Sequence, residues 1–305
     1  MDDVDRRVGR RAFLAGATAT LSGLAGCSGV LGVTGGSGPV SILAAGSLNH
    51  ALENGLAGQV EAELQIEAHG SAKVARMVEA GQKDPDVVSV ADVALFDSPL
   101  SPDWYAEFAT NSLVVAYNPD TAGGQAVAAA GADGWYRPVL DGEAALGRTD
   151  PGQDPLGYRT LFMLELATDH YGTDVDLRAA VPDRDQIYPE TQLVSRFETG
   201  GLDAAVAYRN MAVERGYDYL ELPPEIDLSD PAHADRYATA TYELPGGKQV
   251  QGGLISYAST VRRESDAALG VFEAHTTGQY LTDFGFVVPD DYPRYTGNVP
   301  DELER

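Results

Sequence analysis

Short apolar segments alternate with segments of helical spacing in the first part of the chain. Residues 40–45 form a short, mainly apolar strand and 86–90 a buried one, and residues 60–68 alternate apolar and polar side chains with the period of a strand. Residues 48–58 and 72–80 have helical spacing and follow the first two of these strands. The repetition of strand, loop and helix predicts an open parallel α/β sheet that binds ligands at the carboxyl ends of its strands.

The rest of the chain continues this pattern with longer interruptions. Strands are predicted at 112–117, 204–208 and 252–257, helices at 135–140, 160–171 and 267–278, and a loop at 148–159. The strand near residue 252 indicates a return to the first sheet. We therefore predict two lobes joined by two hinge crossings. The first lobe comprises 40–113 and 254–305, and the second comprises 114–253.

The first 39 residues are typical of an export signal. Arg10 and Arg11 match a twin-arginine motif, and the apolar run after them is shorter than the roughly 20 residues of a membrane-spanning helix. The run ends at Cys27 in a sequence that resembles a lipobox. We predict a signal peptide at 1–26, lipid on Cys27, a Gly/Ser-rich tether at 27–39, and a position on the outer face of the cytoplasmic membrane. An uncleaved anchor helix with an incidental cysteine is the alternative.

Acidic residues outnumber basic residues by 46 to 21, and the formal net charge is −25. Such a surface repels nucleic acid, so we expect no nucleic-acid partner. The chain has only three lysines, at Lys73, Lys83 and Lys248. We interpret the acidity as an adaptation to concentrated salt, in which the Debye length falls to about 3 Å at 1 M. A generally acidic protein is the alternative.

Two predicted strands run into the same dipeptide and then into a helix. Gly46 and Gly70 let the backbone turn tightly and approach a ligand, and Ser47 and Ser71 each offer a hydroxyl beside a helix N-terminus. Free N–H groups and the positive end of the helix dipole bind anions without a basic side chain. The alternative is that both serines are ordinary helix caps.

A rigid loop is predicted between the strand and helix around residue 155. The segment 149–160 contains two Asp-Pro pairs and a Gly-Tyr-Arg sequence that leads into the helix. Pro155 fixes the backbone at the helix entrance, and Asp154 is placed as a ligand or as a cap.

The sequence offers no candidate for catalysis. Cys27 is the only cysteine, which excludes an intrachain disulfide and a cysteine-based metal cluster. There is no Gly-x-Ser-x-Gly elbow and no phosphate-loop lysine. We therefore expect neither an enzyme nor a resident cofactor. The histidines show no metal-ligand spacing: His50, His69, His170, His233 and His275.

Several motifs together resemble a known family, the archaeal tungstate/molybdate-binding lipoproteins of ABC importers, which are related to the bacterial molybdate-binding proteins. The likeness spans the chain from about residue 40 to its end, and the block at 154–159 is its most specific part. The motifs that carry it are 45–48, 69–71 with Arg76, 91–92, 108–111, 135–136, 150–151, 154–159, 190–193, 202–203 and 207–209.

The resemblance implies a two-lobed fold like that of the type II periplasmic binding proteins, with tungstate or molybdate held in the interlobe cleft. It implies a monomer that works with an ABC permease and ATPase and is tied to the membrane by lipid on Cys27. The chain departs from the family at Asn210, where a serine is expected, and in the shortened stretch before Glu190. The ligand-binding residues that it implies are Gly46, Ser47, Ser71, Asp154, Pro155, Leu156, Glu190 and Tyr208.

The resemblance further implies that Asp154 and Glu190 coordinate the metal centre of the oxyanion. Two carboxylates beside a dianion repel it, so this arrangement is useful only if their oxygens reach an electron-poor atom. Tungsten(VI) and molybdenum(VI) can expand from four to six oxygen ligands, whereas sulfur and phosphorus do not readily do so. The pair would then select against sulfate and phosphate. For Glu190, the alternative is a solvated residue at a helix start.

Two other functions remain open at this point. The same architecture could bind sulfate, phosphate or a carboxylate, for which Asp154 and Glu190 would have no use. An exported hydrolase could use Ser47 or Ser71 with Asp154, but it would need a histidine near the serine, and none is visible in the sequence.

Overall fold

The computed structural model describes residues 38–152, 155–181, 186–245, 247 and 249–303. The predicted signal peptide, Cys27 and Asp154 lie outside these residues, as does the side chain of Glu190. Residues 37–305 form one compact unit, which is described here.

The first of two main sheets has six strands in the order β13-β4-β12-β3-β1-β2. β1 pairs in parallel with β2 and β3, whereas β12 pairs antiparallel with β3 and β4. The predicted parallel sheet is therefore correct for the first three strands and wrong for the whole, which is a mixed sheet. Its strands are β1 (Val40–Ala45), β2 (Leu64–His69), β3 (Val87–Val90), β4 (Trp104–Asn111), β12 (Ile255–Val261) and β13 (Arg294–Gly297).

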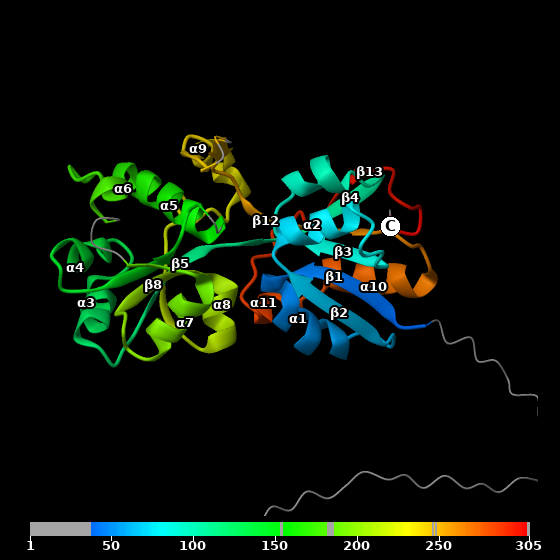
Figure 1. Ribbon diagram of the computed structural model, residues 1–305, viewed down its shortest axis with the longest axis horizontal. Coiled ribbons are helices and arrows are strands. Elements are labelled where there is room, and N and C mark those ends of the chain that lie inside the picture. Colours follow the sequence, from blue (N-terminus) through cyan, green and yellow to red (C-terminus); the bar gives the residue numbers. More distant parts are fainter. Residues whose placement is uncertain (1–37, 153–154, 182–185, 246, 248, 304–305) are drawn as a thin grey trace, which may run out of the picture. The chain divides into compact units, whose positions relative to one another are not determined.

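Helices cover both faces of this sheet (Figure 1). Ile42 of β1 belongs to the larger hydrophobic cluster together with Phe272, whereas the next residue, Leu43, packs with Val74 in a second cluster. Burial on both faces explains why β1 is apolar at every position except Ser41. The helical elements are η1 (Gly46–Leu48), α1 (Asn49–Asn54), η2 (Leu56–Gly58), α2 (Ser71–Glu79), η3 (Phe96–Leu100), α10 (Asp266–Thr277) and α11 (Tyr280–Asp283).

The second sheet has five strands in the order β7-β6-β8-β5-β9. β6 is parallel to β7 and β8, and β5 is antiparallel to β8 and β9. Its strands are β5 (Leu113–Tyr117), β6 (Leu146–Thr149), β7 (Gln186–Tyr188), β8 (Ala204–Tyr208) and β9 (Asp218–Glu221). The helices of this part are α3 (Ala122–Ala130), α4 (Tyr136–Leu140), α5 (Pro155–Tyr171), α6 (Leu177–Ala180), α7 (Glu190–Glu198) and α8 (Arg209–Arg215).

Two connections join the sheets. β4 ends at Asn111 and β5 begins at Leu113, so one chain segment passes directly from the first sheet to the second. The return runs from β9 to β12 through η4 (Pro231–His233), α9 (Ala234–Tyr237) and the hairpin of β10 (Thr241–Glu243) and β11 (Gln249–Gln251). The lobe limits drawn from the sequence stay predictions.

Several predicted boundaries are wrong. α5 begins at Pro155 and not at residue 160, because the segment expected as a loop supplies its first turn. β12 begins at Ile255 rather than at residue 252 and extends to Val261. β2 begins at Leu64 and not at residue 60. The strand β4 is absent from the prediction because its polar and apolar residues are mixed.

Candidate functional site

Ser47 lies in the turn that follows β1. Gly46 is exposed and Ser47 is half-buried within the short helix η1, and no side-chain cap bond is made at the start of η1 or α1. The Ser47 hydroxyl lies instead 3.0 Å from the hydroxyl of Tyr257 in β12. The capping interpretation is therefore wrong for Ser47, whose side chain is held by a different strand of the same sheet.

Ser71 is the first residue of α2, and the N-cap of that helix is Gly70. Its hydroxyl oxygen accepts a hydrogen bond from the backbone N–H of Ala91, at 3.0 Å, just beyond β3. Ser71 is thus not a cap either. Because its oxygen already accepts, its own proton is the group that it can donate to an anion. The first N–H groups of α2 have no intrahelical acceptor, as in any α-helix.

The loop between β6 and α5 is as tight as its sequence indicates. A Cβ atom at Gly157 would come within 2.5 Å of the backbone of Asp150 and Pro151, so only glycine fits there. Asp150 accepts a hydrogen bond from the Gly152 N–H at 2.8 Å, and Pro155 opens the helix with a residue that has no N–H to satisfy.

Leu156 and Pro155 differ in what they can offer a ligand. The Leu156 side chain is 1% exposed and lies in the core, so only its backbone can contact an anion. Pro155 is exposed but has no N–H donor. α7 begins at Glu190, whose side chain lies outside the described part of the protein.

Arg159 is the functional candidate that the sequence argument did not place in the site. Its side chain is 9% exposed, and Nη1 donates to the Tyr208 hydroxyl at 2.7 Å. Burial lowers the pKa of Arg159, but Tyr208, Tyr158 and Asp92 outweigh that effect and hold the pKa above its ordinary value. A permanent positive charge therefore stands beside Tyr208.

Arg159 also interacts electrostatically with residues that contact the Ser47 and Ser71 turns. Its charge lowers the pKa of Tyr257, which contacts Ser47, although burial raises that pKa overall. Asp92, which raises the pKa of Arg159, follows Ala91, the residue bonded to Ser71. The Ser47 turn, the Ser71 turn and the Tyr208 position therefore lie within electrostatic reach of one buried guanidinium.

A buried hydrogen-bond network links Ser47 to the first connection between the sheets. Asn111 Nδ2 donates to Asn210 Oδ1 at 2.7 Å and to the Tyr257 hydroxyl at 3.1 Å. Asn210 Nδ2 in turn donates to the Ser47 carbonyl at 2.8 Å. Asn111, Asn210 and Tyr257 are at most 1% exposed. Asn210, where the sequence departs from its family, is thus a central member of this network.

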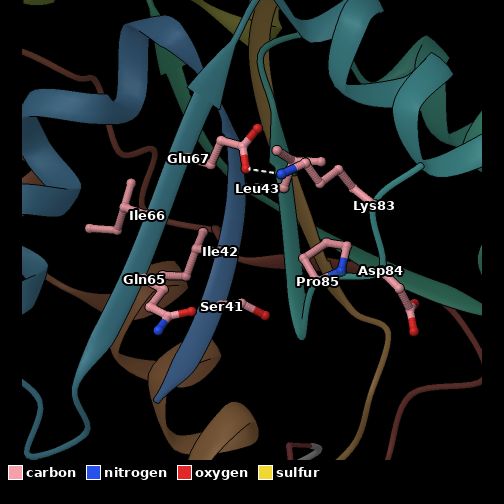
Figure 2. Close-up of a pocket in the computed structure, with 9 residues that line it drawn as sticks. All are labelled: Ser41, Ile42, Leu43, Gln65, Ile66, Glu67, Lys83, Asp84 and Pro85. Carbon is pink, nitrogen blue, oxygen red and sulfur yellow. Dashed lines mark hydrogen bonds and ion pairs between the residues drawn. The ribbon is translucent and has the colours of Figure 1, made fainter. Parts of the chain in front are cut away.

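A pocket of about 280 Å³ is lined along β1 and β2 by residues that include Ser41, Gln65 and Glu67, and Lys83 contacts Glu67 across it (Figure 2). A second pocket, of about 550 Å³, is lined by residues that include Arg209, Asp227 and Ser112, whose N–H is bonded to the Asn111 side chain. Neither pocket is lined by a predicted ligand residue.

Among the described residues, no helix is long and apolar enough to cross a membrane. The same part of the chain holds no cluster of three or more His, Cys, Asp or Glu side chains placed to bind a metal ion.

Residues 40–290 match the family described as bacterial extracellular solute-binding proteins. The chain is 53% identical to a Haloferax volcanii protein provisionally named an ABC transporter molybdenum-binding protein, over 98% of both chains. It is 30% identical to the molybdate/tungstate-binding protein WtpA of Pyrococcus abyssi, over 86% of this chain and 88% of the relative. The chain therefore belongs to the extracellular solute-binding proteins, a family defined by binding and not by catalysis.

Solved structures of molybdate-binding proteins share the fold. The substrate-binding domain of a molybdenum ABC transporter from Clostridium difficile superposes with a TM-score of 0.57 at 15% identity, over 83% of this chain and 100% of that domain. The periplasmic molybdate-binding protein of Azotobacter vinelandii gives 0.53 at 14% identity, over 82% and 99%. The predicted fold class, an α/β fold like that of periplasmic binding proteins, is thus confirmed.

Proposed function

We propose that this protein is the extracytoplasmic binding component of an ABC importer and captures tungstate or molybdate for delivery to the membrane permease. The names of its relatives in Haloferax and Pyrococcus support this ligand class. The observation that carries the proposal is how the two serines are held: Ser47 Oγ lies 3.0 Å from the Tyr257 hydroxyl, and Ser71 Oγ accepts from the Ala91 N–H at 3.0 Å.

The chemistry of these groups suits a dianion whose outer oxygens only accept hydrogen bonds. Ser47 and Ser71 are neutral donors, and the amino end of α2 adds free N–H groups with the positive end of a helix dipole. Charge-assisted hydrogen bonds from neutral donors are roughly twice as strong as neutral pairs. Arg159 is hydrogen-bonded to the Tyr208 hydroxyl, so it adds a fixed positive charge beside Tyr208. The proposed anion site therefore needs no surface lysine.

Asp154 and Glu190 complete the proposal as ligands of the tungsten or molybdenum atom. α5 begins directly after Asp154 and α7 begins at Glu190, so both acids stand at helix starts in the second sheet's part of the chain. An anion whose central atom cannot accept two more oxygens would meet only their repulsion. Selectivity against sulfate and phosphate follows from that difference.

Export and anchoring are part of the same proposal. A binding protein outside the cytoplasmic membrane must remain near its permease, and a lipid on Cys27 with a Gly/Ser-rich tether would keep it there. The twin-arginine signal would carry the chain across as a folded monomer.

Competition calorimetry with tungstate, molybdate, sulfate and phosphate tests the ligand. Residues 28–305, which include the whole compact unit that starts at residue 37, are purified and kept in molar salt. We expect tungstate and molybdate to bind at least about a hundredfold more tightly than sulfate, a difference of about 3 kcal/mol. Tighter binding of sulfate, phosphate or a carboxylate would replace the proposed ligand with that anion.

A further inference from the structure

The donors and acceptors around Ser47 have a defined direction. The first fixed point is the Ser112 backbone N–H, which can only donate and lies 2.9 Å from Asn111 Oδ1. The oxygen of the Asn111 amide therefore faces Ser112. Its nitrogen then faces Asn210 and Tyr257, so Asn111 donates to both.

The second fixed point is the Ser47 carbonyl, which can only accept. Asn210 Nδ2 lies 2.8 Å from it and must donate, which leaves Asn210 Oδ1 to accept from Asn111. A flipped amide at either asparagine would set two donors or two acceptors against each other. Both orientations are therefore determined by backbone groups at opposite ends of the network.

The Tyr257 hydroxyl connects Asn111 to Ser47 in this network. Its oxygen accepts from Asn111, and its second hydrogen-bond partner within the described part of the chain is Ser47 Oγ, 3.0 Å away. Tyr257 is completely buried. A buried hydroxyl that failed to donate would lose a hydrogen bond without any exchange with water, so its proton lies toward Ser47 Oγ.

We propose that Asn111 and Tyr257 are positioning residues that leave the Ser47 hydroxyl proton free to be donated to the ligand. Because Ser47 Oγ accepts from Tyr257, its own proton turns toward the turn after β1, where the proposed function places the oxyanion. The inference rests on that proposed function. Ser71 reaches the same state by a different route, since its oxygen accepts from the Ala91 N–H.

This direction selects a chemical class of ligand. A fully deprotonated oxyanion such as tungstate, molybdate or sulfate presents only acceptors and satisfies both serines. Each serine hydroxyl oxygen has two acceptor lone pairs and only one of them is engaged, so the serines would also admit hydrogenphosphate. The two serines therefore favour any anion that is rich in acceptor oxygens, whereas Asp154 and Glu190 would discriminate between such anions by their central atom.

The test compares Tyr257→Phe with Tyr280→Phe. Tyr280 is a matched control, because it is 3% exposed and its hydroxyl makes a buried hydrogen bond of 2.7 Å to His275, outside the network. Binding of tungstate is measured by calorimetry on the purified protein in molar salt at mildly alkaline pH. We expect Tyr257→Phe to weaken tungstate binding about tenfold, because Ser47 Oγ loses the donor that directs its own proton toward the ligand. Tyr280→Phe should leave tungstate binding unchanged.

An unchanged affinity for tungstate in the folded Tyr257→Phe protein would overturn the inference, as would an equal loss of affinity in both variants. Neutron diffraction of the deuterated wild-type protein gives a second reading that needs neither ligand nor variant. A deuteron on Tyr257 Oη directed at Ser47 Oγ supports the inference, and any other direction overturns it. If the wild-type protein binds neither tungstate nor molybdate, the proposed function is wrong. The deuteron position still shows whether Tyr257 donates to Ser47, so the two failures can be told apart.

Discussion

The Asn210 side-chain amide donates to the Ser47 backbone carbonyl over 2.8 Å, although 163 residues separate the two in the sequence. Asn210 lies in the first turn of α8, which follows β8 of the second sheet, whereas Ser47 follows β1 of the first. The turn that we assign to ligand binding is therefore held by an element from the other sheet. A hinge motion that moved the sheets apart would have to break or stretch this bond.

The first prediction concerns this bond. Asn210→Ala leaves the Ser47 carbonyl and one proton of the Asn111 amide without their partners in a buried region. We expect a loss of about 1–3 kcal/mol in the free energy of unfolding, measured by urea denaturation at constant salt, and weaker tungstate binding. Asn54→Ala is the control, since Asn54 is exposed and its side-chain amide bonds to His50 in the same helix. Equal stability of the two variants would show that the bond is not formed in solution.

The asparagine network could not have been predicted from the sequence, for a physical reason. Asn111 and Asn210 are 99 residues apart, and Asn111 and Tyr257 are 146 apart. A polar residue at the end of an apolar strand carries no sign of its partner, and Asn210 attracted notice only as a departure from the resembled family. The pairing of β4 with β12 brings Asn111 close to Tyr257, and Asn210 reaches them from α8.

Other features were readable because the constraint is local. β1 and β3 are mainly apolar because both of their faces are buried, and both were predicted within a residue of their true limits. Gly157 sits in the most specific motif because the backbone of Asp150 leaves no room for a Cβ atom. The serines show the opposite case. Ser47 and Ser71 stand at helix starts, where capping serines are common, yet their hydroxyls bond to Tyr257 and to the Ala91 N–H.

The second prediction concerns the proposed acid pair. Replacing both Asp154 and Glu190 by alanine removes two oxygens from the proposed coordination sphere and two charges that repel other anions. We expect tungstate binding to weaken and its margin over sulfate to narrow, both measured by competition calorimetry. A Glu198→Ala variant, at the far end of α7, serves as the control for loss of a carboxylate. Unchanged selectivity in the double variant would rule out coordination by this pair.

The third prediction concerns the anchor. Cys27→Ala removes the only thiol that could carry lipid, so the protein should pass from the membrane fraction to the medium. Fractionation of cells followed by detection of the protein measures the change. A Ser28→Ala variant keeps the thiol and should stay with the membrane. Retention of the Cys27→Ala protein by membranes would leave an uncleaved anchor helix as the explanation.

The fourth prediction concerns Asp227, which lies in the return connection between the sheets and is 8% exposed. Burial raises the pKa of Asp227 to about 6 from an ordinary 3.8, against the hydrogen bonds from Ser229 that lower it. Between pH of about 4 and 6, the Asp227 carboxyl therefore keeps its proton in the folded protein but has lost it in the unfolded chain. Stability must fall as pH rises from about 4 to about 6, by up to about 3 kcal/mol for this group.

A buried histidine, His275, has the opposite effect on the pH dependence of stability. The effect of Asp227 must therefore be measured with a variant and not from the wild-type curve alone. Burial lowers the pKa of His275 to about 3, so below its ordinary 6.5 the unfolded chain takes up a proton that the folded protein refuses, and stability falls with falling pH. The two groups act in opposite directions over much of the same interval. In wild-type protein their contributions should largely cancel, and the curve of unfolding free energy against pH should be flatter than either group alone would make it.

Asp227→Asn separates the two contributions. The amide oxygen can still accept from the Ser229 backbone N–H, now 2.9 Å from Oδ1, while the titration disappears. We expect the variant's stability relative to wild type to increase between pH of about 4 and 6 and to level off above that range. Asp86→Asn is the control of opposite sign, because hydrogen bonds from Ser41 and the charge of Arg263 hold the pKa of Asp86 below its usual value despite burial. A relative stability of the Asp227→Asn variant that does not change with pH would show that Asp227 is ionised in the folded protein throughout.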